Sequence, residues 1–209
     1  MITEGQSVSL PSSRTKTEAS VFDTLIAGHP VLDFANTITG WGSNSLEDHI
    51  QSYLDLVVWS VAADVMEPEL ADILAMKGSL EAEEAAAALE NARALRTVLH
   101  YIFAAHAQGA EPSADDMEVF EAFWQQSMSA HRLAFVDDHI EIRPAAFTNL
   151  TIIADLVTRD AVLLMKDLPK KRLRLCANDA CGWLYLVREA RHKGRYCGGR
   201  KCLNGVTHK

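Results

Sequence analysis

The 209-residue sequence contains no run of eighteen or more apolar residues, and none of its four cysteines occurs before position 176. The first absence excludes a membrane-spanning helix, which needs about 20 mostly apolar residues. The N-terminus has no apolar run of signal-peptide length, so we expect a cytoplasmic protein without a membrane partner. Ser, Thr, Gly and Pro dominate residues 1–20, which predicts a disordered N-terminal arm.

Motifs of common enzyme chemistry are missing as well. The sequence has no nucleophile–base–orienter set and no glycine loop of the kind that cradles phosphate. Four polar residues crowd into the segment HPVLDFANT, namely His29, Asp33, Asn36 and Thr37. They could line a pocket, but short polar residues beside an apolar run more often cap helices and bond buried backbone. His100 and His106 are six apart and do not share a helix face. We therefore expect that the protein is not an enzyme.

The hydrophobic pattern from residue 45 onward is mostly helical. Ser45 with Asp48 resembles a capping box and predicts a helix that continues to Val61. Pro68 suits the first turn of a second helix, which Gly78 is expected to interrupt. A long helix follows from about residue 80 to residue 108, with one apolar stripe formed by Ala88, Ala92, Leu95, Leu99, Ile102 and His106.

Residues 113–166 predict two further helices separated by a hairpin. Ser113 begins the first of these helices, which places its core-facing side chains at Met117, Phe120, Phe123, Trp124 and Met128. The period then changes to two, because apolar and polar residues alternate on either side of an Asp-Asp turn at 137–138. A last helix spans about 147–166, and residues 170–174 are expected to form a hinge.

The charge is distributed unevenly along the chain. Residues 171–209 carry ten Lys/Arg and two acidic residues, a net charge of +8, whereas residues 1–170 carry ten basic and 26 acidic residues, a net charge of −16. A basic tail on an acidic body is typical of a nucleic-acid contact confined to the tail. Attraction between the tail and the body explains the same asymmetry equally well.

All four cysteines lie in the segment CANDACGWLYLVREARHKGRYCGGRKC. Two C-x4-C pairs, Cys176 with Cys181 and Cys197 with Cys202, are separated by fifteen residues that read as strand, turn and returning strand. Two such turns brought together by a hairpin supply four thiolates to one tetrahedral zinc ion. Disulfides, an iron–sulfur cluster, and His192 or His208 as a ligand are weaker alternatives. A closed four-cysteine shell has no open position for a catalytic water.

This segment resembles the CGNR zinc finger, with its C-x4-C-GWL knuckle, basic stretch, aromatic-Cys dipeptide and second C-x4-C pair. Upstream, PVLDFANT near residue 30, the YLDLVVWS helix and the helical body resemble the ABATE domain. That domain accompanies this finger in bacterial proteins assigned to stress-induced transcription regulation. The resemblance covers nearly all of residues 21–202. It implies zinc held by Cys176, Cys181, Cys197 and Cys202, with the finger as the DNA contact.

One departure from the family lies just after the last cysteine. The family continues with Gly-Asn-Arg and a basic helix, whereas Cys202 is followed here by Leu203, Asn204 and Gly205. We expect a mainly α fold: a helical ABATE-like body at 21–170 with one small β-hairpin, and a C-terminal treble-clef-like four-cysteine zinc finger at 171–209. The predicted function is bacterial transcription regulation, in which the body senses an effector or forms a homodimer while the tail contacts DNA. The DNA-contacting residues would be Arg188, Arg191, Lys193, Arg195, Arg200 and Lys201.

The alternative function follows from the shortened tail. In that reading the finger is a structural clamp or a protein-interaction module, with its basic face against the acidic body or a partner. The helical body would then bind a small effector, which no sequence feature identifies.

Overall fold

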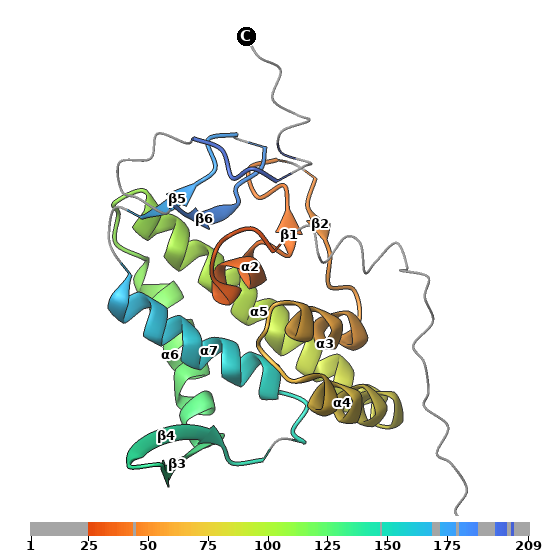
Figure 1. Ribbon diagram of the computed structural model, residues 1–209. Coiled ribbons are helices and arrows are strands. Elements are labelled where there is room, and N and C mark those ends of the chain that lie inside the picture. Colours follow the sequence, from red (N-terminus) through yellow and green to blue (C-terminus); the bar gives the residue numbers. More distant parts are fainter. Residues whose placement is uncertain are drawn as a thin grey trace, which may run out of the picture.

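The computed structural model describes residues 25–43, 45–146, 148–168, 172–178, 180–187, 195–199 and 202, and these form a mainly helical protein (Figure 1). The elements in chain order are α2 (Pro30–Ala35), β1 (Ile38–Thr39), β2 (Glu47–Asp48), α3 (Tyr53–Ala62), α4 (Pro68–Leu80), α5 (Ala82–Ala107), α6 (Ala114–Ser129), β3 (His131–Val136), β4 (His139–Pro144), α7 (Ile152–Asp167), β5 (Leu173–Leu175) and β6 (Leu184–Leu186). The strands form three antiparallel pairs, β1–β2, β3–β4 and β5–β6. The predicted fold class is confirmed. The predicted N-terminal arm lies outside the described residues.

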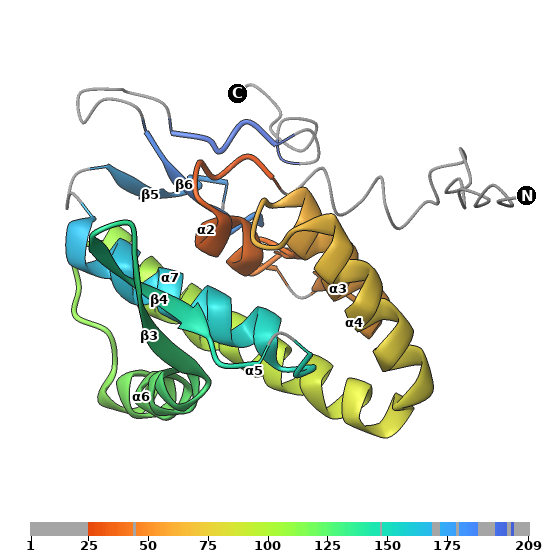
Figure 2. The ribbon, with the colours of Figure 1, turned by 60° about the horizontal axis from the view of Figure 1, so that its bottom comes forward.

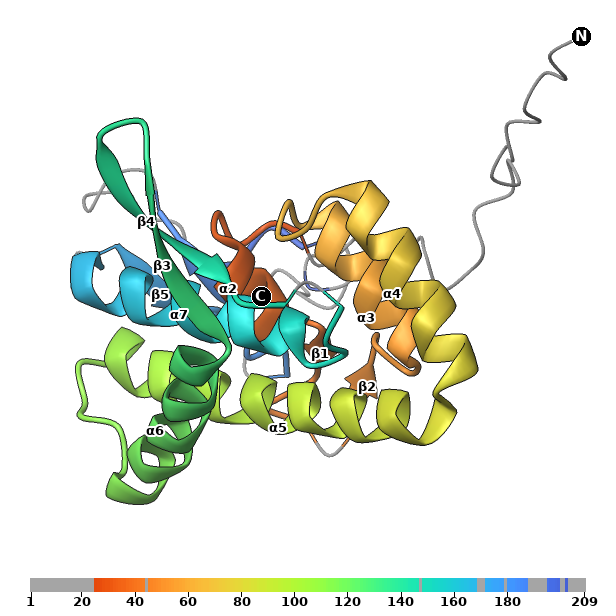
Figure 3. The same ribbon diagram turned by 90° about the horizontal axis from the view of Figure 1, so that it is seen from below.

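Helix α5 is the central element of the molecule. It contacts every other described helix and also β5 and β6, and Figure 3 shows it running along the length of the molecule. Most of its apolar stripe, predicted from the sequence, is buried: Ala88, Ala92, Leu95, Leu99 and Ile102 are all less than 5% exposed, whereas His106 is only partly buried. In the part of the chain that the structure describes, every helix is too short or too polar to traverse a bilayer.

Helix α3 starts seven residues later than the sequence pattern predicts. Its cap is Ser52, whose hydroxyl accepts the Asp55 N–H while the Asp55 carboxylate accepts the Ser52 N–H. The prediction that Ser45 and Asp48 form this capping box is wrong. Asp48 lies in β2 instead, and its carboxylate binds Arg96 of α5 with two contacts of 2.7 Å. Residues 45–55 hold two Ser-x-x-Asp sequences, and the contact of Asp48 with the buried Arg96 leaves the second one to cap the helix.

Helix α4 continues through Gly78, so the prediction that this glycine interrupts the helix is wrong. The break falls at Glu81, where the backbone leaves the helical region (φ −113°, ψ 64°). A Cβ atom at Gly78 would lie 2.7 Å from Cδ1 of Tyr53. The glycine therefore allows α3 and α4 to approach each other closely.

Helices α6 and α7 pack against each other, and the β3–β4 hairpin that joins them projects from the body (Figures 1 and 3). The hairpin is confirmed, with Asp137 and Asp138 in its turn at positive φ (45° and 70°). Of the residues expected on the core side of α6, Phe120 is buried, whereas Met117 and Met128 are 42% and 47% exposed. The apolar stripe of α6 is therefore narrower than its sequence suggests.

The cysteine segment packs directly on the helical body. Strand β5 lies on α5, and Leu173 in β5 and Leu184 in β6 are completely buried in the same hydrophobic core as the helices. Residues 170–174 are therefore not a hinge throughout, because β5 begins at Leu173. Figure 2 shows β5 and β6 beside α2. The division into units at residue 170 stays a prediction.

Candidate metal centre

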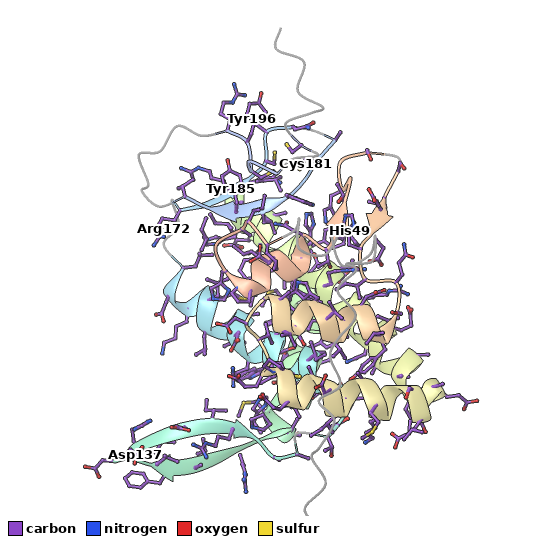
Figure 4. The ribbon with its side chains drawn as sticks, turned by 45° about the vertical axis from the view of Figure 1, so that its right-hand side comes forward. His49, Asp137, Arg172, Cys181, Tyr185 and Tyr196 are labelled. Atoms are coloured by element: carbon purple, nitrogen blue, oxygen red, sulfur yellow. The ribbon has the colours of Figure 1, made fainter. Side chains whose placement is uncertain are left out.

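The four cysteine sulfurs meet at the end of the β5–β6 hairpin. Cys176 follows β5 directly, Cys181 precedes β6, and Cys197 and Cys202 come from the second pair. All four are buried, and their Sγ atoms lie within 4.8 Å of one another. The closest sulfur pairs are Cys176 with Cys202 at 3.4 Å and Cys181 with Cys197 at 3.8 Å. Figure 4 places Cys181 at this end, near Tyr185 and Tyr196.

These separations fit a single tetrahedral ion. Zinc–sulfur bonds of about 2.3 Å in a tetrahedron give sulfur–sulfur edges of about 3.8 Å, inside the observed range. A disulfide needs about 2.05 Å, so none of the cysteines is paired covalently. The two sequence-predicted pairs are thus brought together as one cluster that can hold a metal ion.

The protonation of the cluster shows why a cation suits it. Contacts with the Cys181 and Cys197 thiols lower the pKa of Cys176. Contact with Cys176 in turn raises the pKa of Cys181 well above its usual range and raises the pKa of Cys197 to about 12. Four sulfurs this close cannot all be thiolates by themselves, because their charges repel each other in a buried site. A dication among them removes that repulsion.

Main-chain N–H groups also point at the sulfurs. The N–H of Asn178 bonds to the Cys176 sulfur, that of Trp183 to Cys181, and that of Gly199 to Cys197. The Asn178 side chain donates to the Cys202 sulfur over 3.6 Å. Hydrogen bonds to a thiolate favour its charged form, so the turns are arranged to stabilise four negative ligands.

Strand β6 is bonded along its outer edge to the N-terminal part of the body. The Asn36 carboxamide donates to the Leu184 carbonyl (2.8 Å) and accepts the Leu184 N–H (2.9 Å). Two residues further on, the Leu186 N–H donates to the Ala27 carbonyl at 2.8 Å. An open strand edge is thereby covered, and the metal cluster is fixed to the helical core.

The turn between Cys181 and β6 is held by a second group of contacts. The Trp183 indole donates to the Ile38 carbonyl (2.9 Å), and Nε2 of His100 lies 2.8 Å from the Gly182 carbonyl. His100 also stacks on Trp41, with ring centroids 3.8 Å apart. Burial, partly offset by the Gly182 contact, lowers the pKa of His100 to about 4, so Nε2 of its neutral ring donates to the carbonyl.

The body that carries these contacts matches a family model over residues 28–168, two thirds of the chain. The model is that of the ABATE family, described as "Putative stress-induced transcription regulator". The chain belongs to the ABATE family. A search of curated proteins gave no match. The ABATE match includes Asn36, Ile38, Trp41 and His100, so most of the residues that anchor the cysteine hairpin belong to the family region.

The polar residues of the HPVLDFANT segment in the ABATE region satisfy buried groups, as the sequence analysis expected. His29 caps α2 by accepting the Val31 N–H, and Asp33 accepts the Ala27 N–H at 2.7 Å. Burial raises the pKa of Asp33 to about 6, although that hydrogen bond opposes the shift. Thr37 receives a bond from Arg96 (3.0 Å). The role of Asn36 in binding β6 was not predicted, because its partner lies 148 residues away.

The predicted nucleic-acid contacts fall mostly outside the described residues. Arg188, Arg191, Lys193, Arg200 and Lys201 lie outside the described residues, and Arg195 is exposed. Its carbonyl accepts the Ala177 N–H at 2.8 Å, and the neighbouring Tyr196 is 40% exposed. Arg195 is thus held next to the first cysteine pair of the ABATE protein, with its side chain at the surface.

Proposed function

We propose that the four-cysteine cluster is a structural zinc site. The main evidence is that four cysteine sulfurs are buried at mutual distances compatible with the edges of one zinc tetrahedron. An iron–sulfur cluster would need additional space for inorganic sulfide between the ligands. When bound, zinc supplies folding free energy, about 10 to 16 kcal/mol in small modules, and its closed shell leaves no position for a reacting water. This supports a non-catalytic protein.

We further propose that the protein regulates transcription, with the zinc site holding its basic segment 188–201 for contact with DNA. The description of the ABATE family, the net charge of +8 in residues 171–209 and the exposure of Arg195 support this role. Zinc would hold both ends of the basic segment, since Cys181 and Cys202 flank it. The similarity of the cysteine segment to the CGNR finger supports the same assignment.

A clamp function is the second candidate, and the bonds along β6 favour it. Asn36, Ala27 and Ile38 all bond to residues 183–186, and Leu173 and Leu184 contribute to the core of the helical body. A zinc site connected in this way stabilises the whole protein whether or not DNA is bound. Both functions need the same metal, but only the first needs the basic residues to bind DNA.

Metal content tests the zinc proposal directly. Elemental analysis of the purified protein should give one zinc per chain, and Cys→Ser replacement at each of the four positions should reduce it. Ser45→Cys, at an exposed position, keeps the four ligands and should leave the content at one. A metal content that no cysteine replacement changes would contradict the zinc site.

DNA binding at several salt concentrations separates the two functions. Neutralising Arg188, Arg191, Lys193 and Arg195 to Gln should weaken binding and reduce the salt slope by about 0.9 for each lost phosphate contact. Lys166→Gln, on α7, serves as the control and should leave both unchanged. If the zinc-loaded protein does not bind DNA, or binds it with an affinity that salt does not change, the proposed role in transcription regulation is rejected. A loss of stability of the helical body when zinc is removed would then support the clamp function.

A further inference from the structure

Asn178 lies in the turn that joins Cys176 and Cys181 and stabilises this turn through both its main chain and its side chain. Its N–H donates to the Cys176 sulfur, and its carbonyl accepts the Cys181 N–H at 2.8 Å. The side-chain Oδ1 accepts the Ala180 N–H at 3.1 Å, a bond that asparagine commonly forms to the main chain two residues on. These bonds fix the direction of the carboxamide, so its NH₂ group is available to a partner outside the turn.

The NH₂ group of Asn178 reaches the second cysteine pair. Its Nδ2 lies 3.6 Å from the Cys202 sulfur and 3.5 Å from the Cys202 carbonyl oxygen. Within the part of the chain that the structure describes, the other hydrogen-bonding contact of Cys202 is with the Cys176 sulfur. Asn178 is therefore the described residue outside the cluster that holds Cys202 against the first pair.

Cys176 and Cys197 are attached to the hairpin by main-chain contacts. Cys176 donates its N–H to the Trp183 carbonyl at 2.8 Å. Cys197 lies between Arg195, whose carbonyl accepts an N–H of the first cysteine turn at 2.8 Å, and Gly199. A Cβ atom at Gly199 would lie 2.6 Å from Cζ3 of Trp183, so the main chain packs closely on the indole ring there. Cys202 is thus the ligand whose described attachment depends on a side chain.

We propose that Asn178 is a positioning residue that holds Cys202 on the metal, and that zinc leaves the site by release of Cys202 first. The inference rests on the proposed zinc site. An outer hydrogen bond orients a metal ligand, so a ligand that loses this bond dissociates from the metal more easily. Arg200 and Lys201 directly precede Cys202 in the sequence, so release of this ligand would also free that end of the basic segment.

Two substitutions separate this role from a role in the turn alone. Asn178→Asp keeps the size of the side chain and an oxygen that accepts the Ala180 N–H, because Asp and Asn form the same turn. A carboxylate, however, cannot donate to the Cys202 sulfur. Asn178→Ser keeps a hydroxyl that can accept the same N–H, but this side chain is too short to reach Cys202 and carries no charge. It therefore tests the loss of the donor without added repulsion.

Transfer of zinc from the loaded full chain to an excess of a chromogenic chelator measures how well the metal is retained. Both Asn178 variants should release zinc at least about 10-fold faster than the wild type, since loss of an outer hydrogen bond typically costs about 10-fold to 100-fold in metal affinity. Asn149→Asp is the matched control, because Oδ1 of Asn149 accepts the Thr151 N–H at 3.2 Å in the same kind of turn, in the loop before α7. It should release zinc at the wild-type rate.

Labelling with N-ethylmaleimide identifies the ligand that opens. The zinc-loaded proteins are labelled with free zinc present, and the modified cysteines are located by peptide mass spectrometry. Cys202 should be labelled first in the wild type and several-fold faster in both Asn178 variants, whereas Cys176 and Cys181 should follow later. A residue that only stabilised the turn would leave this order unchanged or would expose Cys176 and Cys181 first.

The outcomes distinguish this inference from the zinc site on which it rests. A zinc-loaded wild type with Asn178 variants that retain zinc equally well would overturn the role of Asn178 and leave the zinc site standing. Faster release from Asn178→Asp but not from Asn178→Ser would also overturn it, because repulsion by the new carboxylate would then explain the effect. Labelling that begins at a cysteine other than Cys202 would contradict the order of release. A wild type that holds no zinc would overturn both proposals together.

Discussion

The carboxamide of Asn36 bonds to both main-chain groups of Leu184, across 148 positions of sequence. An asparagine side chain carries the same donor and acceptor as a peptide group, so it can take the place of a neighbouring strand. Through this contact α2 recognises the hairpin that carries the cysteines. The ABATE body and the metal centre are connected by backbone bonds as well as by apolar packing.

Replacing Asn36 with Ala should destabilise the protein by about 2 to 4 kcal/mol, because two buried main-chain groups lose their partner. Asn91→Ala is the control, since the Nδ2 atom of Asn91 has no hydrogen-bond partner among the described residues, and it should cost less than about 1 kcal/mol. Urea unfolding of the zinc-loaded proteins measures both. If both variants lose the same free energy of unfolding, the contact between Asn36 and Leu184 does not contribute to stability.

Gly182 should tolerate substitution less well than another glycine of similar backbone geometry. Gly182 (φ 69°) would place a Cβ 2.5 Å from the Trp41 Cβ, whereas no atom of the described residues lies within 4 Å of a Cβ added at Gly109 (φ 75°). Gly109→Ala should cost about 1 kcal/mol for backbone strain alone. Gly182→Ala should cost about 1 to 3 kcal/mol more through overpacking, and should disturb the Trp41–His100 stack. Thermal unfolding and tryptophan fluorescence report the two effects, and similar values for both variants would contradict the clash.

Asp33 and His100 should give opposite pH dependences of stability. From about pH 4 to 6 the folded protein keeps Asp33 protonated while the unfolded chain releases the proton, so this term falls as pH rises. Folded His100 is neutral down to about pH 4, whereas unfolded histidine is protonated below about pH 6.5, so its term rises with pH over that interval. In the wild type the two slopes partly cancel.

Asp33→Asn removes the contribution of Asp33 protonation to stability. The free energy of unfolding of the variant should therefore rise more steeply with pH between 4 and 6. At pH 7 it should exceed the wild type by up to about 2 to 3 kcal/mol, because a shift of about two pKa units is lost. Urea unfolding at several pH values measures the difference between the two proteins. Asp72→Asn, at an exposed position on α4, should give a curve parallel to the wild type. A parallel curve for Asp33→Asn would show that this carboxyl is not perturbed.

The two Ser-x-x-Asp sequences within residues 45–55 can be distinguished by mutation. Ser52→Ala should cost about 1 kcal/mol through the loss of the helix cap. Ser45→Ala should change the free energy of unfolding by less than about 0.5 kcal/mol, since Ser45 forms its hydrogen bonds to Ser43 through main-chain atoms. A larger loss of stability for Ser45→Ala than for Ser52→Ala would show that Ser45 caps the helix, as the sequence pattern predicted.

The local sequence pattern was sufficient to predict much of the fold of this protein. Helical periodicity located the buried face of α5, and Ser113 marked where α6 begins, because these signals depend on residues only a few positions apart. The spacing of Cys176, Cys181, Cys197 and Cys202 indicated one cluster, since two knuckles on a hairpin leave few other arrangements. Two of the errors, at Ser45 and Gly78, arose where a side chain distant in the sequence overrides a local signal.

The sequence by itself determined the mainly helical body, the hairpin and the four-cysteine cluster, because periodicity, turns and ligand spacing are short-range properties. Only the tertiary structure decided that Asn36 bonds to Leu184, that His100 bonds to Gly182, and that Asp48 binds Arg96 rather than capping a helix. It also decided that the apolar side of the hairpin faces solvent. These outcomes depend on which surfaces come into contact when the chain packs around α5. The alternation of apolar and polar residues along a strand does not indicate which of its faces another element covers.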